Sequence, residues 1–223
     1  MREKLASLLF GGNCYLCRGD AEAVLCTPCD GDLPRLPRAL CPRCALASPG
    51  GALCGRCLAQ TPHYDATVAA LAYEFPADTL VHALKFRGEL ALAAVLADLL
   101  APRVQDQRVD CIIPVPLSRA RLARRGYNQA AEIARRLNGA KIDVSLCDRT
   151  RDGPPQMELP FAERQRNVRG AFRCNRAIPG ARVAVVDDVM TTGATLDELA
   201  RTLKAAGAVE VVNWVVARTP EHD

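Results

Sequence analysis

The sequence lacks the features that mark membrane-spanning and secreted chains. Its longest apolar runs fall well short of the roughly 20 residues that a membrane-spanning helix needs. The first residues include a basic side chain and several leucines, but they have no apolar stretch of secretory length and no small-residue cleavage pattern. We therefore expect a cytoplasmic protein with no membrane insertion.

Histidine is scarce as well, and the excess of positive charge is small. The three histidines, His63, His82 and His222, have no set of neighbours in the sequence that suggests a metal site or a nucleophile.

A net charge of +4 does not by itself indicate an anionic partner. Residues 113–136, however, contain six arginines and only one acidic residue, a glutamate. This local excess of positive charge would suit binding to phosphate or nucleic acid; alternatively, it is an ordinary solvated basic surface. The candidate nucleic-acid residues among these arginines are Arg119, Arg121, Arg124 and Arg125.

Cysteine, in contrast, is abundant and concentrated. Eight of the eleven cysteines lie before residue 60, in four pairs with two residues between the members of each pair. Such a pair presents two thiolates to one metal ion, and two pairs complete the tetrahedral all-sulfur site that structural Zn2+ requires. The sequence therefore predicts two Zn2+ sites, with the ligands Cys14, Cys17, Cys26 and Cys29 in one and Cys41, Cys44, Cys54 and Cys57 in the other.

The spacing leaves two alternatives open. An interleaved pairing would also use all eight thiolates, although sequential pairing fits the short loops of a zinc ribbon better, and four-cysteine sites also hold iron–sulfur clusters. In either case the segment has few large apolar side chains, so metal binding must supply much of its folding free energy, on the order of 10 kcal/mol per site. We interpret the other cysteines, Cys111, Cys147 and Cys174, as small apolar residues in or near strands.

After residue 60 the composition changes, and strand and helix patterns alternate. The apolar runs predict strands at 68–73, 111–115, 144–147, 182–186 and 209–216. Helical spacing occurs at 78–87, 90–100, 128–137 and 196–206, and Pro102 is expected to end the second of these helices. This alternation predicts an α/β fold with a parallel sheet flanked by helices, preceded by a small cysteine-rich domain. The change in composition divides the chain into residues 1–60 and 61–223.

The most informative segment follows the strand at 182–186. The strand leads into two adjacent carboxylates and then into threonines and a glycine that open a helix, where backbone N–H groups and the helix dipole favour a phosphate. The acids can accept hydrogen bonds from vicinal hydroxyls or orient a hydrated Mg2+. A phosphate next to diol-binding acids describes a ribose 5-phosphate, whereas the alternative is a threonine-capped helix without a ligand. The candidate residues are Asp187, Asp188, Val189, Met190, Thr191, Thr192, Gly193, Ala194 and Thr195.

This segment closely resembles the 13-residue signature of type I phosphoribosyltransferases, which bind phosphoribosyl pyrophosphate (PRPP) with Mg2+. The resemblance implies that Asp187 and Asp188 hold the ribose 2- and 3-hydroxyls and that Thr191 to Thr195 hold the 5-phosphate. Further motifs, in one order along the whole chain, resemble the ComF family: LLFGGNCYLC, LKFRGEL, IIPVPL, RRGYNQ, ERQRNVRGAF and VVDDVMTTGAT. That family combines a double zinc ribbon, here residues 1–60, with a phosphoribosyltransferase domain, here residues 61–223, and is linked to natural competence and DNA uptake.

The resemblance also implies a pyrophosphate-binding loop after the first core strand. The candidates are Pro116, Leu117 and Ser118, together with Lys85 from the preceding helices and Arg164. Residues 151–160 form a candidate mobile loop, and Gln156, Arg164, Arg166 and Asn167 could close over a ligand. An exposed amphipathic helix would explain the same residues.

Two functional hypotheses follow. In the first, the protein is an enzyme that binds Mg2+-PRPP at Asp187 to Thr195 and transfers the phosphoribosyl group to a nitrogen nucleophile. In the second, it is a non-catalytic module that binds single-stranded DNA or proteins of the competence machinery, with PRPP as a regulatory ligand.

Overall fold

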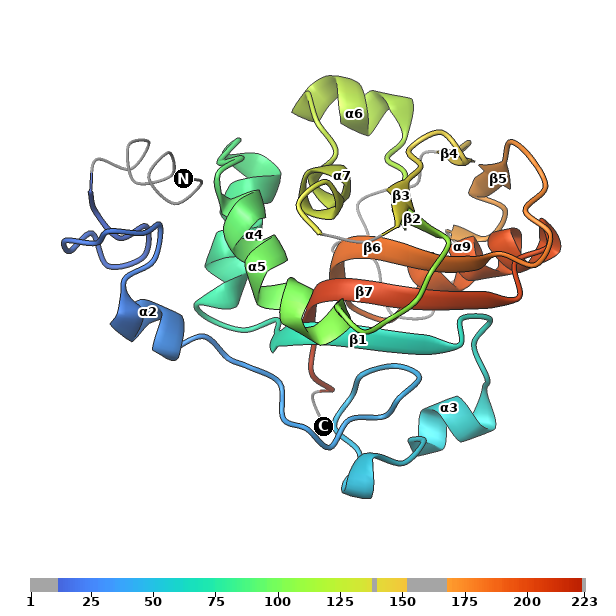
Figure 1. Cartoon of the computed structure of the whole chain (residues 1–223), viewed down its shortest axis with the longest axis horizontal. Coiled ribbons are helices and arrows are strands. Elements are labelled where there is room, and N and C mark those ends of the chain that lie inside the picture. Colours follow the sequence, from blue (N-terminus) through green and yellow to red (C-terminus); the bar gives the residue numbers. More distant parts are fainter. Residues whose placement is uncertain (1–11, 138–139, 152–167, 222–223) are drawn as a thin grey trace.

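The computed structural model describes residues 12–137, 140–151 and 168–221. Among these residues, a cysteine-rich part precedes a layered α/β part (Figure 1). The helices are α2 (Thr27–Gly31), the 3₁₀ turn η1 (Pro49–Gly51), α3 (Gly55–Ala59), α4 (Ala77–Phe86), α5 (Leu92–Val104), α6 (Arg119–Arg125), α7 (Gln129–Ala134) and α9 (Ala194–Ala205). The strands are β1 (Ala66–Ala72), β2 (Cys111–Pro114), β3 (Lys141–Ile142), β4 (Cys147–Arg149), β5 (Phe172–Cys174), β6 (Arg182–Met190) and β7 (Glu210–Arg218).

Five of the strands form one parallel sheet in the order β1-β7-β6-β2-β3, which confirms the predicted fold class. The two long strands β6 and β7 lie at its centre, and most of their residues are apolar and buried, as is typical of parallel strands covered on both faces. Strands β4 and β5 pair separately as a short antiparallel ribbon beside α9 (Figure 1).

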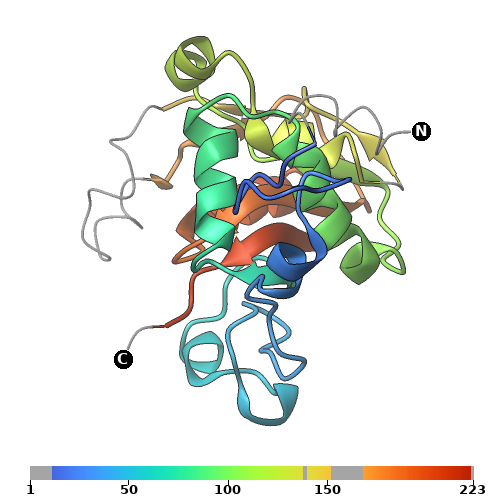
Figure 2. The same ribbon diagram turned by 90° about the vertical axis from the view of Figure 1, so that its left-hand side faces the viewer.

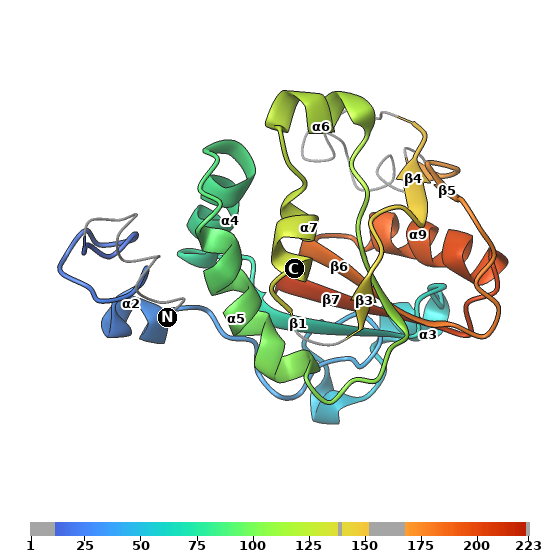
Figure 3. The same cartoon turned by 45° about the horizontal axis from the view of Figure 1, so that its top comes forward.

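Two buried clusters cover the two faces of the sheet. Alternate residues of β6 belong to different clusters: Ala184 and Val186 pack with α4, α5 and α7, whereas Val183 and Val185 pack with α9. This alternation follows from the two-residue repeat of a strand. Figure 3 shows α4, α5 and α7 together on one side of the sheet. Trp214 of β7 is buried in the first cluster, as expected for a packing residue, and its indole N–H donates to Gln107.

The second half of the cysteine-rich part lies beside the β1 edge of the sheet, whereas the first half lies beside α4 and α5 (Figure 1, Figure 2). Between the two halves, Arg35 forms an antiparallel bridge with Leu71 of β1. Ala72 N–H donates to the carbonyl of Pro34 at 2.7 Å, and Leu36 N–H donates to that of Ala70 at 3.3 Å. The chain that joins the two halves therefore covers the outer edge of β1.

Three sequence predictions are corrected in detail. Pro102 does not end α5, which continues to Val104; a proline so near the end of a helix removes only one backbone hydrogen bond and leaves the last turn intact. The strand expected at 144–147 begins only at Cys147, because the Asp143 carboxylate accepts hydrogen bonds from the Ser145 N–H and hydroxyl and so forms a turn. Strand β6 extends beyond 186 to Met190, so the two acids belong to the strand itself.

In the described part of the chain, every helix is too short or too polar to cross a membrane.

Candidate functional site

The turn between β6 and α9 has the geometry of a ligand-binding loop at the carboxyl end of a central strand. Gly193 begins α9 with a φ of 85°, in the left-handed region that favours glycine. A β-carbon at this position would lie 2.7 Å from the Met190 methyl and 3.1 Å from the Tyr64 hydroxyl. Thr192 Oγ1 accepts from Ala194 N–H at 3.2 Å, which fixes the start of the helix. The turn therefore requires glycine at position 193, both for its φ and for the close packing of Met190 and Tyr64.

The two acids of β6 lie on opposite faces of the sheet and have different partners. Asp188 is 2% exposed and faces α4 and α7, where Lys85 Nζ lies 2.5 Å from its Oδ2 and Gln129 Nε2 lies 3.5 Å from its Oδ1. Asp187 is partly buried and accepts from the Asp188 N–H at 2.9 Å. Lys85 therefore contacts the acid pair directly.

The electrostatics of the pair separate the two acids. Burial raises the pKa of Asp187 well above its usual value, and the neighbouring Asp188 charge raises it further. For Asp188, burial is the largest effect and acts to raise the pKa, but the Lys85 ammonium and the hydrogen bonds with Asp187, Lys85 and Gln129 together outweigh it, so the pKa of Asp188 is lowered. The same ion pair raises the pKa of Lys85 despite its burial. Asp188 is thus held ionised, whereas Asp187 favours its protonated form unless a cation or a hydrogen-bond donor binds next to it.

The eight paired cysteines form two separate clusters in the sequential grouping. The four Sγ atoms of Cys14, Cys17, Cys26 and Cys29 lie within 4.8 Å of one another, as do those of Cys41, Cys44, Cys54 and Cys57. Tetrahedral Zn2+ with bonds of about 2.3 Å holds its sulfurs about 3.8 Å apart. The Cys17–Cys26 and Cys44–Cys54 sulfurs are 3.7 Å and 3.6 Å apart. The clusters fit one structural Zn2+ each and leave little room for a multi-iron cluster.

Backbone donors support thiolates in both clusters. Cys26 N–H donates to Cys14 Sγ and Cys54 N–H donates to Cys41 Sγ, each at 3.4 Å. Burial acts to raise the pKa of Cys14 and of Cys41, but the backbone N–H donors outweigh it and lower both values to about 6. The pKa of Cys29 rises instead to about 12, chiefly through its contact with Cys26. Four crowded thiols cannot all ionise without a cation, which is the electrostatic reason for a bound metal.

Comparisons with known proteins agree with this arrangement. A phosphoribosyl transferase domain model matches residues 91–222, and a double zinc ribbon domain model matches residues 5–58. The chain is 35% identical over 222 residues to the DNA utilization protein YhgH of Escherichia coli O6:H1, covering 93% of this chain and 97% of that protein. It is 33% identical to competence protein F of Haemophilus influenzae, covering 94% and 98%. The chain belongs to the ComF family.

A more distant relative and one solved structure complete the comparison. Competence protein ComFC of Streptococcus pneumoniae is 24% identical over 225 residues, covering 97% of each chain. The crystal structure of purine phosphoribosyltransferase from Pyrococcus horikoshii Ot3 matches with a TM-score of 0.33 and 21% identity, covering 53% of this chain and 67% of that chain.

In this ComF protein, the expected pyrophosphate loop follows β2 and leads into α6. Pro116 and Leu117 are partly buried in this loop, while the Ser118 hydroxyl accepts from Arg121 N–H at 3.3 Å and so caps α6. Of the other candidates, Lys85 lies at the acid pair. Gln156, Arg164, Arg166 and Asn167 lie outside the described residues, as does the expected mobile loop beyond Arg151.

The α6 arginines divide into two groups. Arg119 and Arg124 are exposed, and Arg121 is partly buried. Arg125 instead faces the site: it donates to the Gln129 side-chain oxygen and stacks over the Phe86 ring at 5.3 Å. Because Gln129 in turn contacts Asp188, α4, α6 and α7 meet at the acid pair.

Arg218, at the end of β7, is a site residue that the sequence analysis did not single out. It is 2% exposed and donates from Nε to the carbonyl of Cys44 at 2.8 Å. Its Nη1 donates to the carbonyls of Met190 and Thr219, both at 2.9 Å, and to that of Thr191. Arg218 therefore joins the second cysteine cluster to the turn after β6. The sequence did contain a signal for Arg218: a charged residue directly after the apolar run of a central parallel strand often lies at a ligand-binding edge.

Proposed function

We propose that this ComF protein binds Mg2+-PRPP at the turn between β6 and α9 and transfers the phosphoribosyl group to a nitrogen nucleophile with release of pyrophosphate. The observation that carries the proposal is the acid pair, with its buried lysine, beside a glycine-started helix on a central parallel strand. We also propose a cytoplasmic location, because eight metal-binding thiolates are best kept reduced there.

Each part of the site has a separate task in this proposal. The backbone of Thr191 to Ala194 and the threonine hydroxyls bind the 5-phosphate, and Asp187 accepts from the ribose hydroxyls. Bound Mg2+ would neutralise charge on the pyrophosphate. Lys85 holds Asp188 ionised and in position, at the point where α4, α6 and α7 meet. Positioning and charge neutralisation would supply most of the rate, since among the described residues no side chain is placed as an obvious general base.

The test is calorimetric titration of zinc-loaded protein with PRPP, with and without Mg2+. We expect Mg2+-dependent binding in the wild type and its loss in Asp187→Asn. Asp148→Asn, which alters an exposed carboxylate on β4, is the matched control and should bind normally. Absence of PRPP binding in the zinc-loaded wild type would refute the proposal. If binding is present, acceptor-dependent release of pyrophosphate distinguishes an enzyme from a protein that uses PRPP as a regulatory ligand.

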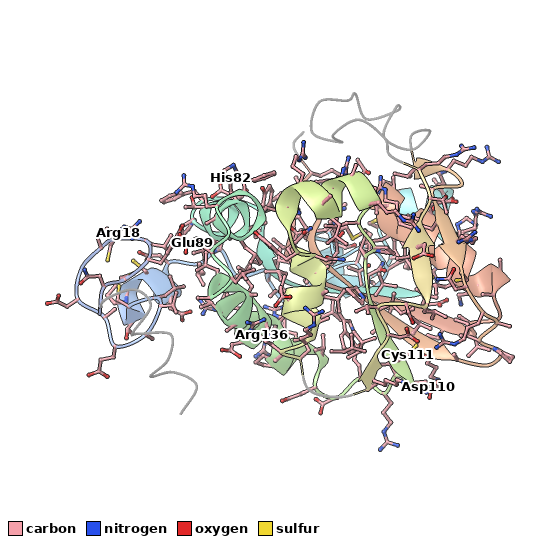
Figure 4. All side chains as sticks on the ribbon, turned by 90° about the horizontal axis from the view of Figure 1, so that it is seen from above. Arg18, His82, Glu89, Asp110, Cys111 and Arg136 are labelled. Carbon is pink, nitrogen blue, oxygen red and sulfur yellow. The ribbon has the colours of Figure 1, made fainter. Side chains whose placement is uncertain are left out.

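One surface favours the second candidate function, binding of single-stranded DNA. Phe86 of α4 is 54% exposed, and its ring lies 4.7 Å from that of His82 and under the Arg125 guanidinium. The exposed Arg119 and Arg124 lie nearby on α6. Figure 4 shows His82 on the outer side of α4. Aromatic faces beside arginines suit stacked bases and a phosphate backbone.

This second candidate predicts binding that weakens with salt. Arg119→Ala with Arg124→Ala should lower the affinity for a single-stranded oligonucleotide and reduce the slope of affinity against salt by about one per lost phosphate contact. Phe86→Ala should weaken binding without changing that slope. Salt-independent binding, or equal loss from a pair of arginines elsewhere, such as Arg173 and Arg182, would rule this surface out.

A further inference from the structure

A pair of cysteines outside the candidate site lies on the ribbon of β4 and β5. Cys147 and Cys174 are direct partners in the antiparallel register. The neighbouring pair is hydrogen-bonded, because Asn175 N–H donates to the Leu146 carbonyl at 2.9 Å. The cysteines therefore occupy the next, non-hydrogen-bonded position, where opposite Cα atoms are about 4.5 Å apart and side chains share one face. The sequence analysis interpreted both only as small apolar residues.

This geometry fits a disulfide bond without movement of the backbone. The Cys147 and Cys174 sulfurs are 2.9 Å apart. A disulfide bond is about 2.05 Å long and joins residues whose Cα atoms are about 4.4 to 6.8 Å apart. The two sulfurs are therefore within about 1 Å of bonding distance.

The surroundings assign different roles to the two thiols. Cys174 is partly exposed and lines a surface hollow together with Arg173, Arg176 and Arg201, whereas Cys147 is 2% exposed. The hydrogen bond from Cys147 lowers the pKa of Cys174, and Arg176 adds to this effect. The same hydrogen bond and burial raise the pKa of Cys147. Cys174 is thus the accessible thiolate and Cys147 the buried thiol behind it.

We propose that Cys147 and Cys174 form a redox-active pair that closes to a reversible disulfide when the protein meets a hydroperoxide. The Cys174 thiolate attacks the terminal oxygen of the hydroperoxide and the O–O bond breaks, which gives a sulfenic acid on Cys174. The leaving group is the alkoxide, or hydroxide in the case of hydrogen peroxide, and it takes up a proton. The Cys147 thiol then attacks that sulfur, the S–O bond breaks, and water leaves. In sum, two thiols are oxidised by two electrons, and one hydroperoxide is reduced to water and its alcohol, or to two waters for hydrogen peroxide.

The disulfide would tie together the two ends of the chain segment between β4 and β5. The ribbon has only three residue pairs, and a two-stranded ribbon of this size is marginal without support. Its present support is packing against α9, including a contact from Cys174 Sγ to the Thr202 carbonyl at 3.8 Å. A covalent link would therefore add to the packing that holds this short ribbon against the rest of the fold. The proposal does not depend on PRPP binding.

The test is oxidation of full-length, zinc-loaded protein with hydrogen peroxide, with zinc release followed by a chelating dye. Before zinc is lost, non-reducing tryptic mapping should yield the peptide Ile142–Arg149 linked to Cys174–Arg176, and dithiothreitol should separate them. The midpoint of thermal unfolding should rise by about 5 °C or more on oxidation and return on reduction.

Variants separate the roles. In Cys147→Ser, Cys174 should still react and accumulate sulfenic acid, detected as a dimedone adduct. In Cys174→Ser, peroxide consumption before zinc loss should fall about tenfold. Cys111→Ser is the matched control and should change nothing, because Cys111 starts β2 near Asp110 (Figure 4), and burial and nearby acids raise its pKa. If no linked peptide forms while zinc is retained, or if Cys111→Ser slows the reaction as much as Cys174→Ser, the proposal is wrong.

Discussion

The two cysteine clusters are near copies of each other in local structure. In each, the third cysteine precedes a five-residue helix with nearly the same backbone angles, φ −73° with ψ 158° at Cys26 and ψ 159° at Cys54. Each also has a residue of positive φ directly after its second cysteine, namely Arg18 and Ala45. The local sequence is sufficient to specify this unit, which agrees with its use twice in the first 60 residues.

The clusters differ in what surrounds them. Cys17 of the first cluster is exposed, and the apolar neighbours Tyr15 and Leu25 join the buried cluster that includes α4, the helix that carries Lys85. Cys44 of the second cluster is fully buried, and its carbonyl binds Arg218, which holds the turn after β6. Similar units are thus placed beside different parts of the candidate site. We therefore expect the two units to affect the candidate site differently, because of where they lie and not because of their metal ligands.

The strongest way to break this comparison is to remove one ligand from each cluster. Cys44→Ser should release one Zn2+ and unfold the second unit, since a structural site contributes on the order of 10 kcal/mol to folding. We expect PRPP affinity to fall at least about tenfold because Arg218 loses its anchor. Zinc stoichiometry and PRPP calorimetry measure the two effects. Cys17→Ser, the matched change, should also release one Zn2+ but alter PRPP affinity less than about twofold. Equal losses of affinity would contradict the comparison.

The next test targets Arg218, the residue that joins the second cysteine cluster to the turn after β6. Arg218→Met leaves several buried carbonyls without a donor, so unfolding free energy should fall by about 4 kcal/mol, with zinc content unchanged. In the segment between the two halves, Arg35→Met removes an exposed pair with Asp30 and should cost less than about 1 kcal/mol. Denaturant titration measures both. A small loss for Arg218→Met would show that the second cluster is not coupled to the turn.

Two glycines sharpen the assignment of the turn. Gly193 has a positive φ, and a β-carbon there would clash with Met190 and Tyr64. We expect Gly193→Ala to lower the free energy of unfolding by about 3 kcal/mol and to impair PRPP binding. Gly180 has a similar φ of 75°, but a β-carbon added there would have no non-neighbouring atom within 4 Å. Gly180→Ala should therefore lower the free energy of unfolding by about 1 kcal/mol and leave PRPP binding intact. Thermal unfolding and calorimetry give the comparison, and equal effects on binding would argue against the turn as the ligand site.

The smallest expected effect concerns pH. Because the folded-state pKa of Asp187 lies above the unfolded value of 3.8, its contribution to stability is complete below that value and is lost as pH rises through the folded pKa. Asp187→Asn should remove this loss and raise the stability of the ligand-free protein at neutral pH by about 1 kcal/mol. Urea unfolding at several pH values should show the two proteins diverging as pH increases. Parallel curves would exclude a raised pKa at Asp187.

Much of the fold and part of the site could be predicted from sequence because their signals are local. Cysteine spacing specified both metal sites, and the apolar run before Asp187 specified β6 and its position in a parallel sheet. The errors also have local causes: the Asp143 turn competed with a strand, and Pro102 lies too close to the end of α5 to stop it. Arg218 and the Cys147–Cys174 pair could not be assigned, because their partners are distant in sequence and only the folded chain brings them together.

The strip of chain at Pro34 to Leu36 has a consequence for association. It pairs with the Ala70 carbonyl and the Ala72 N–H of β1, two of the backbone groups with which a strand from another molecule could pair. We therefore expect the cysteine-rich part to limit edge-to-edge association of the sheet. A chain that begins at residue 61 would bare these groups and should form oligomers at concentrations where the full-length protein stays dispersed.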